Sequence, residues 1–490
     1  MNPVETGILG FYFLCMGLLA VYGFHRLYLV FLYRRHRNDR PIAPADLPGL
    51  PVLTVQIPLY NEACVAERII DAACALDYPA GQLEIQILDD STDETSEICR
   101  RKVEDQAARG VRIRHIRRGS REGFKAGALK AGLREAAGEF VAIFDADFIP
   151  TPDFARRILP HFSDPSVGMV QARWGHLNRD YSALTRVQSI FLDGHFVIEQ
   201  TARNRSGRFF NFNGTAGIWR RSCIESAGGW QHDTLTEDLD LSYRAQILGW
   251  KFLFLPDLVA PAELPVEINA FKTQQHRWAK GSIQTGLKLL PRILGSRLPL
   301  GVKTEAFFHL TSNFAYVLMV LVSLLFFPSI RVREEMRWNA LLALDLPIFL
   351  LATGSVLAFY ILSQREVLAG WSGSLRYLPF LMSVGVGLCV NNTRAVLEAL
   401  AGRRTEFIRT PKLRVEGPCL PAGPRKYRGS LSSLTLLELA LGIYFTGILV
   451  YAAAHRVYAS IPFLILFQAG YLYTAFLSLG QAARTRASKS

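Results

Sequence analysis

Long apolar runs at both ends of the chain constrain its fold more than any other feature. The first run covers residues 7–32 and is followed by a basic cluster that includes Arg34, Arg35 and Arg37. No small-residue cleavage site is evident, so the pattern indicates an uncleaved membrane anchor within residues 1–40 and not a signal peptide. Four more runs, each long enough to cross a bilayer as a helix, follow residue 300. These runs are 307–328, 341–362, 434–454 and 462–479.

The stretch 377–400 is ambiguous because Asn391, Asn392, Arg394 and Glu398 interrupt its apolar residues. The segment that follows it is strongly basic, and basic segments stay on the cytoplasmic side of a membrane. If 377–400 lies along the membrane surface, this segment and the basic tail both remain inside. We therefore expect a multi-pass protein of the inner or plasma membrane. We expect five spans in total, the anchor and four in the membrane region 300–490, and an interfacial helix near 377–400 in the same region.

Residues 50–290 have a different character. Short apolar runs such as 53–57, 84–88 and 140–144 alternate with helix-like stretches such as 63–76, 91–108 and 125–136. This alternation predicts an α/β domain with a largely parallel sheet, and in such sheets ligands bind at the carboxyl ends of the strands. The excess of 55 Lys+Arg over 42 Asp+Glu gives a net charge of +13. It is concentrated beside the apolar runs, where it suits anionic lipid, so no nucleic-acid partner is required.

Two polar clusters follow the first expected strands. In Gln56-Ile-Pro-Leu-Tyr-Asn-Glu62, Tyr60 and Glu62 suit the base and ribose of a nucleotide, although Pro58 and Asn61 can equally just end a strand. In Leu88-Asp-Asp-Ser-Thr-Asp93, the adjacent carboxylates Asp89 and Asp90 suit a nucleoside. The alternative is a helix N-cap, since Ser, Thr and Asp satisfy free backbone N–H groups there.

Two further groups suit a phosphate and its counter-ion. Asp145 and Asp147 follow a third apolar run, and alternate positions on an extended strand point to the same side. We expect them to converge on Mg²⁺ or Mn²⁺, which prefer oxygen ligands. The alternative is an Asp-rich turn before Pro150. Lys125, at the start of a helix-like stretch, suits a phosphate or a base, or lies on a solvated helix face.

The last two motifs suit an acceptor. In Thr236-Glu-Asp238 a carboxylate can take the proton of an attacking hydroxyl, as a general base does. In Gln274-Gln-His-Arg-Trp278, Arg277 suits phosphate charge and Trp278 offers a flat face to a sugar. Trp278 is also the type of residue found at membrane interfaces.

The order D, D-x-D, T-E-D, Q-x-x-R-W between an anchor and C-terminal spans resembles the membrane-bound inverting glycosyltransferases of family 2. Within that family the chain is most similar to the cellulose-synthase-like mannan and glucomannan synthases. The resemblance covers nearly the whole chain and is carried by the segments QIPLYNE, LDDSTDET, FKAGALK, FDADF, FNGTAGIWR, TEDLDLSYR, QQHRWAKG and TEFIRTPK.

This resemblance implies a GT-A (Rossmann-like) fold that binds a UDP- or GDP-sugar. It assigns the nucleotide sugar to Tyr60, Glu62, Asp89, Asp90, Lys125 and Asp145, and the metal to Asp145 and Asp147. Asp238 is then the base, and the acceptor lies against Glu237, Gln274, Arg277 and Trp278.

The expected activity is transfer of a hexose to a growing β-glycan, processively and with export through the adjacent spans, by a domain in the cytoplasm. The alternatives are single-sugar transfer to a lipid such as a ceramide or diacylglycerol, and a non-catalytic transporter or scaffold.

Overall fold

The computed structural model describes residues 2–41, 49–336, 342–403, 405, 407–416 and 433–487. Its centre is a seven-stranded mixed sheet with the strand order β3-β2-β1-β4-β6-β5-β7. Only β6 runs antiparallel to its neighbours β4 and β5, so the predicted, largely parallel α/β sheet is confirmed. The strands are β1 (Leu53–Leu59), β2 (Leu83–Asp89), β3 (Ile113–Arg117), β4 (Phe140–Ile143), β5 (Val167–His176), β6 (Gly217–Arg220) and β7 (Lys251–Ala262).

Helices cover both faces of the sheet because successive strand residues point to opposite sides. Phe140 and Ala142 of β4 pack with α2, α3 and α5, whereas Val141 and Ile143 pack with α4, α8 and α9. Both faces are therefore dry, which explains why the strands read as continuous apolar runs. The bounds of these helices are α2 (Ala66–Cys74), α3 (Thr95–Ala108), α4 (Phe124–Glu135), α5 (Phe154–Ile158), α8 (Arg221–Ser226) and α9 (Glu237–Ile247).

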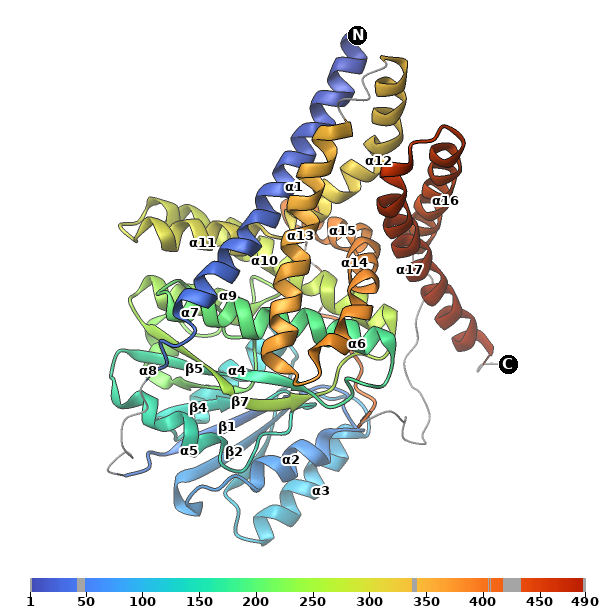
Figure 1. Cartoon of the computed structure of the whole chain (residues 1–490). Coiled ribbons are helices and arrows are strands. Elements are labelled where there is room, and N and C mark those ends of the chain that lie inside the picture. The colour runs from blue at the N-terminus through green and yellow to red at the C-terminus, as the bar shows by residue number, and fades with distance from the viewer. Residues whose placement is uncertain are drawn as a thin grey trace.

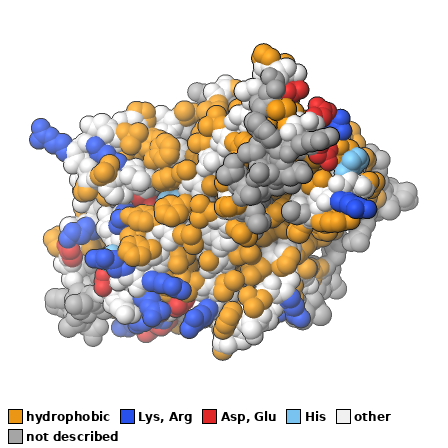
Figure 2. Space-filling model, turned by 45° about the horizontal axis from the view of Figure 1, so that its top comes forward, with side chains coloured by type: hydrophobic (Ala, Val, Ile, Leu, Met, Phe, Trp, Pro, Cys, Tyr) orange, Lys and Arg blue, Asp and Glu red, His pale blue; other side chains and the backbone are white. Residues whose placement is uncertain are grey.

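Within the described residues, five helices are long and apolar enough to cross a membrane: α1 (Pro3–His36), α12 (Phe314–Glu335), Trp371–Leu400, α16 (Ser433–Ala454) and α17 (Ile461–Ala487). In Figure 1 the membrane helices stand on one side of the sheet domain, and α13 (Leu342–Val367) lies beside α1. Figure 2 shows many hydrophobic side chains over this end of the molecule, as expected for a lipid-facing surface.

Two expectations about the membrane region differ from the structure or stay open. The run expected from residue 307 is broken, because α11 (Leu300–Thr311) packs on α10 and the spanning helix α12 starts only at Phe314. The stretch 377–400 forms two consecutive helices, α14 (Leu378–Gly387) and α15 (Cys389–Leu400), which pack on α17 and α10. Its interfacial placement and the domain boundaries stay predictions. Part of the expected basic segment, residues 417–432, lies outside the described residues.

Helix α10 (Ile268–Gly295) joins the sheet domain to the membrane helices. The Nζ of Lys272 donates to Glu438 Oε2 at 2.6 Å, and the Nζ of Lys280 donates to Glu398 Oε2 at 3.1 Å. All four side chains are buried, so these pairs attach α10 to α16 and α15 with little screening by solvent. Helix α10 also carries the Q-x-x-R-W motif, which is thereby held beneath the membrane helices.

Candidate functional site

Asp89 and Asp90, at the end of β2, have different surroundings. Asp89 is buried, and its carboxylate accepts hydrogen bonds from the backbone of Ser91 at 2.8 Å and from His115 Nε2 at 2.9 Å. Burial opposes ionisation, but the hydrogen bonds from His115 and Ser91 outweigh it and lower the pKa of Asp89 to about 2. Asp90 accepts a forked contact from Arg118, whose Nε lies 2.9 Å from Oδ1. Of the two carboxylates, Asp90 is therefore the one that Arg118 holds in place.

Tyr60 and Glu62 follow the end of β1. The Arg121 guanidinium lies over the face of the Tyr60 ring, 3.4 Å from its centroid. Glu62 accepts a hydrogen bond at 2.9 Å from Arg409 Nε, and the same guanidinium contacts the carbonyl of Asn61. Burial raises the pKa of Glu62, and Arg409 opposes this shift.

The D-x-D triplet does not lie on a strand. Because β4 ends at Ile143, Asp145 and Asp147 occupy a turn in which Phe148 N donates to Asp145 O at 3.1 Å. Strand alternation therefore does not bring the two side chains to one side, contrary to the prediction, and each carboxylate accepts from a different lysine. Lys125 Nζ lies 2.5 Å from Asp145 Oδ1, and Lys412 Nζ lies 2.6 Å from Asp147 Oδ2.

Asp238 lies in the first turn of α9, beside a tight turn at Gly214. Gly214 has a φ of +82°, and a Cβ atom there would lie 2.9 Å from Asp238 Oδ2, so only glycine permits this approach. Burial and the neighbouring Glu237 carboxylate raise the pKa of Asp238 to about 7, while Lys125 opposes the rise. A carboxylate with a pKa near neutrality is suited to accept a proton at physiological pH.

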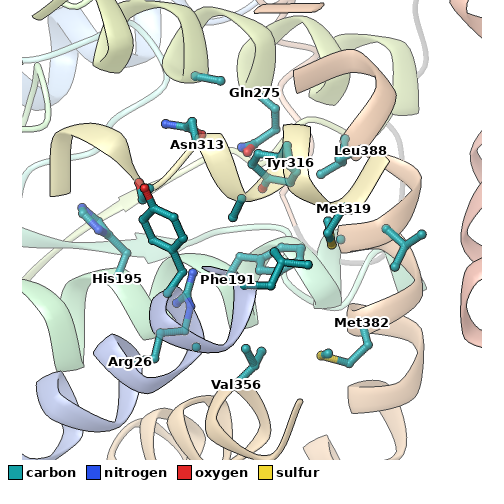
Figure 3. Close-up of a pocket in the computed structure, with 18 of the residues that line it drawn as sticks. Arg26, Phe191, His195, Gln275, Asn313, Tyr316, Met319, Val356, Met382 and Leu388 are labelled. Carbon is teal, nitrogen blue, oxygen red and sulfur yellow. The ribbon is translucent and has the colours of Figure 1, made fainter. Parts of the chain in front are cut away.

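Two residues of the Q-x-x-R-W motif of α10 line the same cavity as Asp238. A cavity of about 570 Å³ is lined by Asp238, Gln274 and Trp278 together with residues of the membrane helices, among them Tyr316 of α12 and Met382 of α14. Figure 3 shows Gln275, Asn313 and Tyr316 around this space, with Phe191 and Val356 farther along it. The cavity thus runs from the carboxylate of α9 into the membrane bundle.

Arg277 lies between this cavity and a segment that sequence reasoning left without a role. The Arg277 guanidinium donates to Ile408 O at 3.2 Å and lies 4.4 Å from the centroid of the Phe407 ring. Burial lowers its pKa, and Glu237, Asp145 and Asp238 oppose this shift. We call residues 407–416 the crossing segment, because it reaches from the end of α15 across the site to Asp147. TEFIRTPK marked it only as part of the resemblance, and no local pattern predicted that Arg409 and Lys412 contact acidic residues hundreds of positions away.

The predicted site residues thus form two connected groups. Glu62 and Asp147 bond to the crossing segment, and Tyr60 and Asp145 each stand two positions before one of them. Asp238, Gln274 and Trp278 instead line the cavity. Lys125 connects them, because its Nζ also donates to Gly214 O at 2.9 Å. The Asp89 carboxylate is fully buried, and its oxygens accept hydrogen bonds from Ser91 and His115 within the fold.

Comparisons with known proteins identify the family and the fold of the chain. A sequence-family profile described as "Glycosyltransferase like family 2" matches residues 48–281. Glucomannan 4-beta-mannosyltransferase 1 of Oryza sativa subsp. japonica is 37% identical over 404 residues, which are 78% of this chain and 73% of that protein. Glucomannan 4-beta-mannosyltransferase 2 of Arabidopsis thaliana is 46% identical over 254 residues, 51% of this chain and 48% of that protein. The chain therefore spans about half the length of this second relative.

A solved structure shares the fold. It is a mannosyltransferase from Pyrobaculum calidifontis in complex with GDP-Man and Mn²⁺, with a TM-score of 0.52 and 22% identity. The match covers 72% of this chain and 98% of that one. The predicted GT-A-type fold is confirmed by this match together with the mixed sheet.

Proposed function

Because the chain belongs to glycosyltransferase family 2, we propose that it is a membrane-embedded inverting hexosyltransferase that adds mannose from GDP-mannose to a growing β-glycan. The relatives are named as glucomannan 4-beta-mannosyltransferases, and the protein that shares the fold was solved with GDP-Man, which supports this donor over a UDP-sugar. Membership of an enzyme family leaves no support for the non-catalytic transporter or scaffold.

The observation that carries the proposal is the placement of Asp238. Its carboxylate lines a cavity that continues between the membrane helices, and Trp278 lines the same cavity. A sugar stacked on Trp278 would present a hydroxyl to Asp238, which takes its proton as the oxygen attacks the anomeric carbon. Attack from the side opposite the departing diphosphate inverts the donor, so an α-linked donor gives a β-linked product. The product then has a route into the membrane bundle.

The two carboxylates of the D-x-D turn would hold Mg²⁺ or Mn²⁺. Within the described residues no group of three or more His, Cys, Asp or Glu could hold a metal ion, but Mg²⁺ is commonly held by one or two carboxylates and the substrate's phosphates. Asp145 and Asp147 would supply these carboxylate oxygens, and the ion would compete there with the lysine ammonium groups that now contact them. The ion would neutralise charge on the departing nucleoside diphosphate. Arg277 and Lys125 would act on the same charge from the protein side.

We also propose that the sheet domain faces the cytoplasm. The crossing segment is basic and contacts this domain. Arg34 and Arg35 lie in the last turn of α1, and the carbonyl of Arg37, which follows that turn, accepts a hydrogen bond from Arg205. Basic residues beside spans are retained on the cytoplasmic side, where nucleotide sugars are made available to the enzyme.

The test is a panel of GDP- and UDP-sugars with purified protein in nanodiscs and Mg²⁺ or Mn²⁺, scored for nucleoside diphosphate release and product size. We expect GDP-mannose to give the fastest nucleoside diphosphate release and a β-linked polymer. In Asp238→Asn the rate of release should fall by at least about 100-fold. A single glycolipid product would favour transfer to a lipid acceptor instead. If no donor is turned over, or if Asp238→Asn is as fast as wild type, the proposal fails.

A further inference from the structure

A π-helical turn lies between the membrane helices and Asn213, the residue before Gly214. It covers Gly194–Gln200 and joins α6 (Ala183–Asp193) to α7 (Thr201–Arg205) in one continuous helix. We call it the π turn. Such turns are rare, and they occur frequently at functional sites.

The π turn brings two side chains to one amide group. His195 Nε2 lies 2.9 Å from Asn213 Nδ2, and Gln200 Nε2 donates to Asn213 Oδ1 at 2.6 Å. Residues five apart point about 140° away from each other around an α-helix, whereas the wider π turn brings them toward one face. The π geometry therefore allows His195 and Gln200 to hold both ends of the same side chain. His195 also lines the cavity, as Figure 3 shows.

The hydrogen-bond network assigns the protonation of His195. Since Asn213 Oδ1 accepts from Gln200, the group that faces His195 Nε2 is the amide nitrogen, which is only a donor. His195 Nε2 must then be an acceptor, and its proton lies on Nδ1, which donates to Glu199 Oε2 at 3.0 Å. Glu199 in turn contacts Arg203 at 3.3 Å, so an ion pair fixes the orientation of the imidazole.

The asparagine held in this way begins the turn that organises the site. The next residue, Gly214, presents its carbonyl to Lys125 and leaves room for Asp238 Oδ2. The residue after that, Thr215, accepts a hydrogen bond at 2.8 Å from the backbone N–H of Asp145. Movement of the turn would therefore displace the proposed base and the D-x-D carboxylate together.

We propose that His195 and Gln200 are positioning residues that set the place of Asp238 through the amide of Asn213. This inference rests on the proposed function, in which Asp238 is the base. Displacement of a reacting group by about 1 Å costs on the order of 100-fold in rate. Loss of the hydrogen bonds to Asn213 is therefore expected to lower kcat. The residues assigned to the donor, such as Asp145, do not bond directly to His195, Gln200 or Asn213, so the donor's KM is expected to change less than kcat.

Two substitutions of similar size separate positioning from packing. His195→Gln places an amide oxygen near the former Nε2 and keeps an acceptor for Asn213. His195→Asn keeps a donor near Nδ1 for Glu199 and loses that acceptor. We expect His195→Asn and Gln200→Ala to lower kcat on the order of 10- to 100-fold, with the donor KM within about threefold of wild type. His195→Gln is expected to retain kcat within about threefold.

The control is His161→Gln, a buried histidine of the segment Leu159–Ser163, which lies outside both residue groups of the site. Kinetics in nanodiscs with GDP-mannose and thermal melting of each variant complete the comparison. Equal kcat values for His195→Asn and His195→Gln, or a rise in KM that matches the fall in kcat, would overturn the positioning role alone. An inactive wild-type protein would overturn the proposed function and this inference with it.

Discussion

Removal of the Lys125 ammonium group is expected to move the pH dependence of sugar transfer. A Cβ built on Gly214 would lie 2.9 Å from Asp238 Oδ2 and 3.3 Å from Lys125 Nζ. The two charged atoms are therefore within about 6 Å of each other, where opposite charges attract by about 3 kcal/mol at an effective dielectric constant of about 20. This attraction holds the pKa of Asp238 below the value that burial and the Glu237 carboxylate alone would give it.

The sign follows from the role of the carboxylate. Asp238 accepts a proton only when ionised, so activity is present above its pKa, which lies at about 7, and is lost as the pH falls through it. Lys125→Met raises this pKa, and the acidic limb of the rate profile should move to higher pH. The absolute rate also falls, because Lys125 contacts the D-x-D turn.

The assay is nucleoside diphosphate release from GDP-mannose between pH 5.5 and 10 at a fixed Mn²⁺ concentration, with kcat plotted against pH. Lys130→Met provides the control, since Lys130 is an exposed lysine on the same helix, α4. Its profile should coincide with that of wild type. If Lys125→Met lowers the rate by the same factor at every pH, the electrostatic coupling to Asp238 is refuted.

Three further changes test other contacts. Lys412→Met frees the second D-x-D carboxylate and should strengthen Mn²⁺ binding to the donor-free protein by roughly tenfold in calorimetry; unchanged affinity would show that this lysine does not compete with the ion. Lys272→Met leaves the Glu438 carboxylate unpaired and should destabilise the protein by about 3–5 kcal/mol in denaturant unfolding, with partial recovery when Glu438→Gln is added. In Gly281→Ala the new Cβ would lie 2.5 Å from Thr236, which should cost about 1–3 kcal/mol and slow transfer. A fully active, equally stable variant would contradict the close packing of α10 on that turn.

Much of the candidate site was predictable because its residues follow strands. Asp90, Asp145 and Asp238 stand out as acidic residues directly after apolar runs or at a helix start, and strand ends of an α/β sheet lie at one edge. The details of their contacts were not predictable. His115 bonds to the carboxylate of Asp89 because β3 pairs with β2. This pairing exists only once the sheet is assembled.

The amino-acid sequence by itself determined the apolar segments, the alternation of strands and helices, and the residue types available to a nucleotide sugar, because these depend on neighbours within a few positions. The tertiary structure decided which distant groups meet. Arg409 reaches Glu62 across 347 positions, and His195 reaches Asn213 only because a π turn replaces an α-helical one. Such contacts depend on how helices pack against the sheet and the membrane bundle, and no periodicity in the chain records that packing.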